Sequence, residues 1–104
     1  MKKLLLAAFL FAASYANAQD RYAIGMEKAF ALWEEQKMME ASHLFERIAT
    51  AEPDKWLPYY YVSQINTLIS FGETDEAKLS NQLEKAKEFL DVAKAISPNN
   101  PELL

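Results

Sequence analysis

The sequence of 104 residues contains no cysteine, one histidine and two glycines. Without cysteine the chain cannot form disulfides, use a thiol nucleophile, ligate zinc or an iron–sulfur cluster through sulfur, or be lipidated at a signal site. A single histidine excludes His-rich metal sites and argues against a histidine-based triad, and the isolated glycines exclude a phosphate-binding loop. We therefore expect no catalytic residue, no metal site and no cofactor, and the chain is not expected to be an enzyme.

Basic side chains are also few, with 11 Lys and Arg against 15 Asp and Glu. Two of the lysines, Lys2 and Lys3, belong to residues 1–18, so the rest of the chain has nine basic and 15 acidic side chains and a formal charge of −6. A nucleic-acid binder needs a basic face that displaces counterions from phosphates. No nucleic-acid partner is expected.

Residues 1–18 have the order of an export signal. Lys2 and Lys3 precede an uncharged apolar run of about ten residues, Leu4 to Ala13, and Ala16-Asn17-Ala18 offers a cleavage site. We expect a signal peptide over residues 1–18, cleavage before Gln19, and an exported protein that is periplasmic or secreted. The apolar run is about half of the ~20 residues that span a membrane, so no stable span is expected after cleavage. An uncleaved N-terminal anchor is the alternative.

Residues 19–104 read as helices separated by turns. No run of alternating β-branched residues occurs, and turn residues fall at Pro53-Asp54, at Gly72-Glu73-Thr74 and at 98–101. Two segments each carry one apolar stripe at helical spacing. The stripes are Ala41, Leu44, Phe45, Ile48 and Ala49, and then Leu79, Leu83, Ala86, Leu90 and Ala93, the second widened by Phe89 and Ile96.

Two further segments, Tyr22 to Trp33 and Trp56 to Phe71, are apolar around more of their circumference and need covering on two sides. The order of segments predicts an all-α fold of four helices in two stacked helix-turn-helix hairpins, with the broad-faced helices in the middle layer. Pro58 fits a first helical turn, and Gly72 is expected to close the third helix in a left-handed conformation. Thr74 is expected to cap the fourth helix, with Asn81 as an alternative start.

The second helices of the two hairpins share a spaced pattern. Ala41, Phe45, Ile48 and Pro53 match Ala86, Leu90, Ala93 and Pro98 in offset. The small residue lets two helices approach, the large one fills the gap beside it, and proline ends the helix. This pattern resembles the second helix of a tetratricopeptide repeat (TPR). The resemblance implies a TPR-like domain over 19–104, with repeats at about 22–55 and 56–100 and the start of a third at 101. The second unit is longer than a repeat of this family, which implies an insertion near residues 72–82.

The resemblance also implies a binding surface, because the first helix of each repeat lines the inner face of such folds and that face usually holds a peptide. Carried over to this chain, the surface consists of Met26, Phe30, Trp33, Leu57, Tyr60, Gln64 and Thr67. For the aromatic members, packing in the core is the competing interpretation.

The remaining polar candidates do not form a reactive group. His43 lies among charged residues on the outer side of its helix and is expected at the surface. The adjacent pairs Glu34-Glu35 and Asp75-Glu76 do not share a helix face and make poor acid–base couples. Met38-Met39 lacks the further methionine or histidine that a copper site needs.

The sequence therefore predicts an exported module that binds a protein or peptide without catalysis. Two alternatives stay open: the N-terminal helical domain of a longer exported protein whose enzymatic or ligand-binding function lies downstream, and an unrelated secreted four-helix bundle. Because Phe89 and Ile96 add apolar surface to the fourth helix, self-association through the C-terminal hairpin is also expected.

Overall fold

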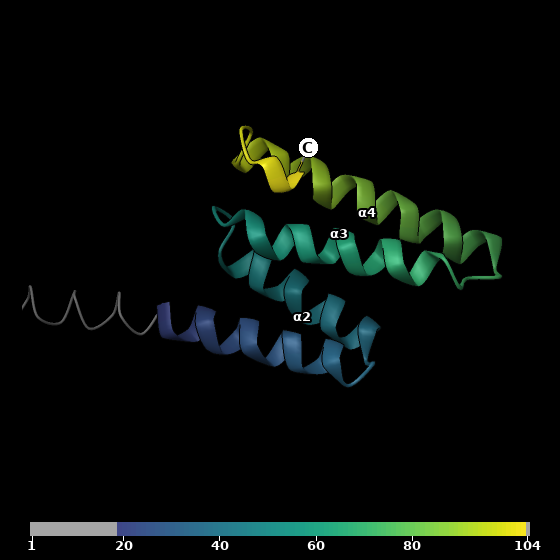
Figure 1. Ribbon diagram of the computed structural model, residues 1–104, viewed down its shortest axis with the longest axis horizontal. Coiled ribbons are helices and arrows are strands. Elements are labelled where there is room, and N and C mark those ends of the chain that lie inside the picture. The colour runs from purple at the N-terminus through teal and green to yellow at the C-terminus, as the bar shows by residue number, and fades with distance from the viewer. Residues whose placement is uncertain (1–18, 104) are drawn as a thin grey trace, which may run out of the picture.

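The computed structural model describes residues 19–103 as four α-helices and a short 3-10 helix. The first helix covers residues 19–34 of this part, and α2 (Met38–Ala51), α3 (Trp56–Ser70), α4 (Glu76–Ile96) and the 3-10 helix η1 (Pro101–Leu103) follow (Figure 1). No strand occurs within residues 19–103, so the predicted all-α fold of four helices is confirmed. The expected signal peptide, residues 1–18, lies outside the described residues.

The helices follow one another side by side, each antiparallel to the one before it (Figure 1). The first helix and α2 form one hairpin, and α3 and α4 form the second. Tyr61 of α3 contacts Phe30 and Trp33 of the first helix, and α3 also packs along α2 and α4. α3 therefore has three helical neighbours, which explains why its sequence is apolar around most of its circumference.

The turn between the first helix and α2 is closed by a Schellman motif. The backbone N–H of Lys37 donates to the carbonyl of Leu32 (2.9 Å), and that of Gln36 donates to the carbonyl of Trp33 (3.0 Å). Gln36 has φ 67°, the left-handed conformation that this motif requires and that glycine usually supplies. The chain thus reverses at Gln36, whose left-handed conformation is unfavourable for a residue with a β-carbon.

The turn between α3 and α4 differs from the sequence prediction in two ways. Gly72 does not have a positive φ, because α3 ends on Phe71 in a right-handed helical conformation (φ −64°, ψ −26°). The cap of α4 is Asp75 instead of Thr74, since its carboxylate accepts a hydrogen bond from the N–H of Lys78 (3.0 Å). A carboxylate satisfies an unpaired N–H and also interacts favourably with the positive helix end. Asn81, the alternative start, lies inside α4. Pro58 lies in the first turn of α3, as predicted.

The core joins the first three helices, and its buried members are Met26, Ala29, Ala41, Phe45, Ile48, Val62 and Ile65. Small residues set the distances between helices. Ala41 is fully buried, and a β-carbon at Gly25 would lie 3.2 Å from Cδ1 of Ile48. The first hairpin therefore packs closely at both of these small residues.

The buried side of α4 is rotated from the predicted stripe. Ala86 and Ala93 are buried, as predicted, but Leu83 is 49% exposed. Phe89 packs toward the core instead of adding outer surface, and its ring lies 5.8 Å from that of Tyr59. Ala86 and Ala93 lie where α4 comes closest to α3. Leu83 and Phe89 lie on opposite sides of the line that joins these two alanines along the helix.

Candidate interaction surface

α3 buries one side, and its opposite side ranges from partly buried to exposed. Because successive residues are about 100° apart, the side opposite the buried residues is formed by six residues, here called the α3 face. The α3 face consists of Leu57, Tyr60, Gln64, Thr67, Leu68 and, at the C-cap, Phe71. Phe71 is 82% exposed and Leu68 is 43% exposed. No residue of α3 is charged, so this face is an uncharged strip along the middle of the molecule.

An aromatic cluster supports the α3 face from one edge. The ring of Tyr61 lies 4.8 Å from that of Phe30 and 5.9 Å from that of Trp33, both edge-on, and it stacks on Phe45 at 5.3 Å. Tyr60 lies 5.4 Å from Tyr61. These contacts fix the orientation of Tyr60 relative to the core.

The three predicted site residues of the first helix are placed toward the interior. Met26 is buried in the core and offers almost no surface to a ligand. Phe30 and Trp33 are half-buried against the core and contribute the edge of the aromatic cluster. The first helix needs these side chains to cover both α2 and α3, so they serve mainly in packing.

The four predicted residues of α3 all lie on the α3 face. Leu57 packs partly against the core, while Tyr60 and Gln64 are each partly exposed. The hydroxyl of Thr67 donates to the carbonyl of Ser63 in its own helix (2.8 Å). Gln64 and Tyr60 are therefore the members whose polar groups have both a donor and an acceptor to offer a ligand.

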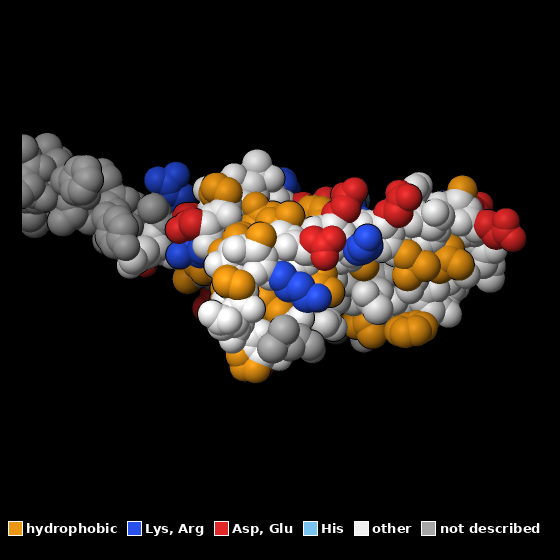
Figure 2. Space-filling model, turned by 90° about the horizontal axis from the view of Figure 1, so that it is seen from above, with side chains coloured by type: hydrophobic (Ala, Val, Ile, Leu, Met, Phe, Trp, Pro, Cys, Tyr) orange, Lys and Arg blue, Asp and Glu red, His pale blue; other side chains and the backbone are white. Residues whose placement is uncertain are grey.

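Sequence reasoning did not select the two most exposed apolar residues of this surface. Leu68 and Phe71 fall in the same apolar segment as the predicted residues, but the pattern alone treats them as core candidates. The helical angle places them opposite Val62 and Ile65, but the sequence does not show which side of this broadly apolar helix is buried. Hydrophobic side chains also gather where α3 turns into α4, at the right-hand end of the view onto α4 (Figure 2).

The electrostatics of the α3 face are neutral at physiological pH. Burial raises the pKa of Tyr61, and the nearby Tyr60 and Glu102 raise it further. Tyr61 borders the α3 face, and the face itself contains no Asp, Glu, His, Lys or Arg. Its interactions are therefore expected to depend little on pH or salt.

Residues 19–103 contain neither a candidate metal cluster nor a candidate membrane span. Within residues 19–103 no group of three or more His, Cys, Asp or Glu side chains is arranged to hold a metal ion. His43 is exposed, as predicted. In the same range, no helix combines the length and apolarity needed to cross a membrane.

Comparisons with protein-family models, with curated proteins and with solved structures find no match to the chain. The function is therefore inferred from the α3 face itself.

Proposed function

We propose that the chain is an exported helical-repeat module that binds a protein or peptide on the α3 face and has no catalytic activity of its own. The observation that carries the proposal is the exposure of Leu68 (43%) and Phe71 (82%) on a helix without charged residues. Contiguous apolar surface of this kind favours a partner that buries apolar side chains of its own. Residues 1–18 would direct the export.

The TPR resemblance is part of the proposal, and packing supports it. Ala41 and Ala86 hold matching positions in the repeated pattern, and their side chains are 0% and 7% exposed. Pro53 and Pro98 follow the ends of α2 and α4, as the pattern requires. In a TPR-like arrangement α3 is a first helix, so the α3 face would belong to the inner surface that holds a ligand.

The partner that fits this surface is an uncharged peptide with aromatic or branched aliphatic anchors. Phe71 and Leu68 would contact the anchors, and the amide of Gln64 would pair with a peptide group. The half-buried Tyr60 would contribute a ring that is already fixed by its neighbours, which lowers the entropy lost on binding.

Peptide selection on the immobilised chain without residues 1–18 tests the proposal. Calorimetry of a selected peptide should show that Leu68→Ala and Phe71→Ala each weaken binding by about tenfold or more, because each removes a central apolar contact. Val92→Ala is the control matched to Leu68→Ala, since Val92 is exposed to a similar extent as Leu68 (41% against 43%) but lies on α4. Equal losses in all three variants, or no loss at Leu68 and Phe71, would count against the α3 face.

A second copy of the chain is the other partner that we propose. Leu83 is 49% exposed in the N-terminal half of α4, and Phe71 is 82% exposed at the turn that precedes this helix. An isologous contact would bury both side chains in each protomer.

A further inference from the structure

A cleft of about 390 Å³ opens on the side of α3 away from the α3 face. It lies between the start of α2, the end of α3 and the start of α4, and this volume falls in the range of small-molecule sites. Its lining combines two aliphatic side chains with amides and charged groups: Met39, Asn66, Ile69, Glu73, Lys78, Asn81, Gln82 and Lys85. None of the lining residues is aromatic, which separates the cleft chemically from the α3 face.

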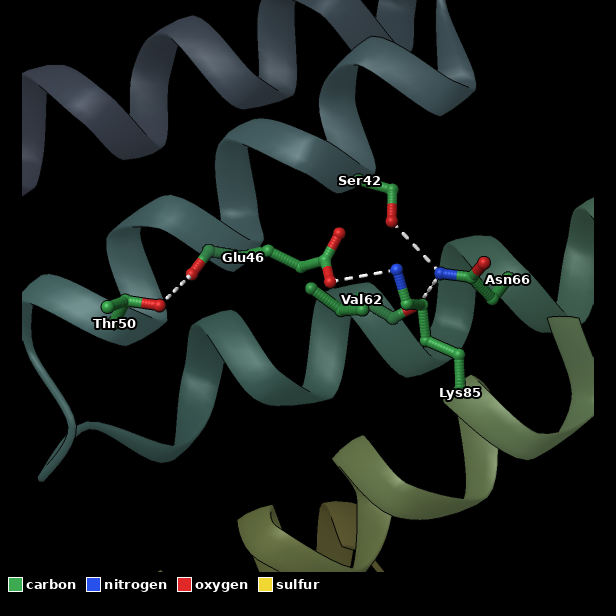
Figure 3. Close-up of polar contacts among 6 residues, drawn as sticks. All are labelled: Ser42, Glu46, Thr50, Val62, Asn66 and Lys85. Carbon is green, nitrogen blue, oxygen red and sulfur yellow. Dashed lines mark hydrogen bonds and ion pairs between the residues drawn. The ribbon is translucent and has the colours of Figure 1, made fainter. Parts of the chain in front are cut away.

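Asn66 provides one hydrogen-bond acceptor in this cleft. Its side chain is almost fully buried, and its Nδ2 donates to Oγ of Ser42 (2.9 Å) and to the carbonyl of Val62 (2.8 Å) (Figure 3). Both hydrogens of the amide nitrogen are thereby used within the protein. The group that Asn66 can still offer a ligand is its carbonyl oxygen, Oδ1.

Gln82 provides a second acceptor. Its Nε2 donates to Oε1 of Glu73 (2.8 Å), and its own Oε1 is buried without a donor among residues 19–103. The hydrogen bond from Gln82 is the main reason that the pKa of Glu73 is lowered, so Glu73 is ionised at neutral pH and can only accept. Glu73 therefore fixes which way the amide of Gln82 points and leaves a carbonyl oxygen that a ligand could satisfy.

The charges around the cleft cancel. Lys85 forms an ion pair with Glu46 (2.8 Å, Figure 3), and Lys78 is close enough to Glu73 to contribute to its lowered pKa. Two cations and two anions leave no net charge to attract an ion. The cleft instead offers two amide oxygens as acceptors, the donors of Lys78 and Asn81, and the aliphatic surface of Met39 and Ile69.

We propose that this cleft binds a small neutral carboxamide. The N–H groups of the ligand donate to Oε1 of Gln82 and Oδ1 of Asn66, and its carbonyl oxygen accepts from Lys78 or Asn81. The alkyl part of the ligand packs on Met39 and Ile69. This site lies apart from the α3 face, so either proposal can fail while the other stands.

Titration of the ¹⁵N-labelled protein with butyramide tests the site by NMR. Butyramide is expected to shift the side-chain amide signals of Gln82 and Asn66 in a saturable way, with a dissociation constant on the order of millimolar for so small a ligand. The isosteric ketone 2-pentanone has no N–H donor and should bind at least about fivefold more weakly. Equal shifts with both compounds would show apolar partitioning only and would overturn the proposal, as would the absence of saturation.

Two matched variants test whether Gln82 contributes to butyramide binding. Gln82→Met keeps the side-chain length but removes the acceptor, so butyramide binding should weaken at least about fivefold. Gln19→Met makes the same change at an exposed residue of the first helix, outside the cleft, and should leave butyramide binding unaltered. Unchanged affinity in Gln82→Met would contradict the assignment. If that variant does not fold, the comparison of butyramide with 2-pentanone on the unaltered protein decides alone.

Discussion

Gln36 occupies a backbone position that glycine or asparagine fills in most helix ends of this type. Its φ of 67° follows from the two hydrogen bonds that close the turn and from the need to reverse the chain before α2. A side chain with a β-carbon is strained in this region, whereas glycine is not.

Gln36→Gly is therefore expected to stabilise the protein by about 0.5–1 kcal/mol. Chemical denaturation followed by circular dichroism measures the change. Gln36→Ala keeps the β-carbon and the strain, so its free energy of unfolding should stay close to that of the unaltered chain. A loss of stability in Gln36→Gly would show that the side chain of Gln36, and not its backbone, matters here.

Glu73 shows how a single side chain is set by its neighbours. Hydrogen bonds from Gln82 and from the N–H of Asp75 favour its ionised form and lower its pKa from 4.5. Because the pKa is lower in the folded than in the unfolded state, Glu73 contributes stability above the unfolded pKa. That contribution is lost as the pH falls through the folded pKa.

Carboxyl-carbon NMR should find the pKa of Glu73 below 4.5. In Gln82→Met the main cause of the shift is gone, so the pKa of Glu73 should rise toward 4.5. A pKa of Glu73 that does not move in this variant would mean that the hydrogen bond to Gln82 does not form in solution.

The helices are the scale at which sequence and structure agree best. The spacing of apolar residues predicted four helices, and the buried alanines Ala41, Ala86 and Ala93 lie on the predicted stripes. The predictions that were wrong concern pairs of nearby residues that suit the same helical position equally well. Thr74 and Asp75 can both cap a helix, and the choice between Leu83 and Phe89 for the inner side depends on where α3 lies.

The two candidate sites differ in how far the sequence could predict them. Leu57, Tyr60, Gln64 and Thr67 lie on one helix, so periodicity alone could place them together. The cleft brings Asn66 and Gln82 together from α3 and α4, and no sequence spacing predicts that contact. Its polar groups would have been interpreted as ordinary surface residues.

Close approach of α4 to its neighbours depends on Ala86. Ala86→Leu is expected to overpack this contact and to lower the free energy of unfolding by about 1–3 kcal/mol. Ala95→Leu is the control, because Ala95 is exposed on the same helix and should change stability little. Equal midpoints of denaturation for the two variants would contradict the assignment of Ala86 to the helix contact, and Ala41→Leu tests the first hairpin in the same way.

At the scale of the whole molecule, apolar exposure is concentrated on the second hairpin. Leu68, Phe71, Leu83 and Val92 are four of the exposed large hydrophobic side chains, and all belong to α3, α4 or the turn between them. The helices on either side carry the charges, while α3 carries none. Among residues 19–103 the α3 face is thus a surface without charged side chains in an acidic protein, which favours an apolar partner there.

Self-association is expected to use the hairpin end. Light scattering at tens of micromolar should detect dimers, and Leu83→Glu should shift them toward monomer, because it places a charge on the contact surface. Phe89→Glu is not a suitable test, since Phe89 packs toward the core and its replacement would unfold the helix contact. A monomer at all concentrations would exclude the second copy as a partner without affecting the peptide proposal.

Chemical-shift mapping with a selected peptide tests most directly whether the α3 face is the binding surface. The backbone amides of Tyr60, Gln64, Thr67, Leu68 and Phe71 should shift together as the peptide saturates the protein, with smaller changes near Trp33 across the aromatic cluster. The exposed side of α2 around His43 should stay unchanged. Shifts concentrated on α2, or on the cleft around Gln82, with the α3 face unaffected would contradict the proposed function.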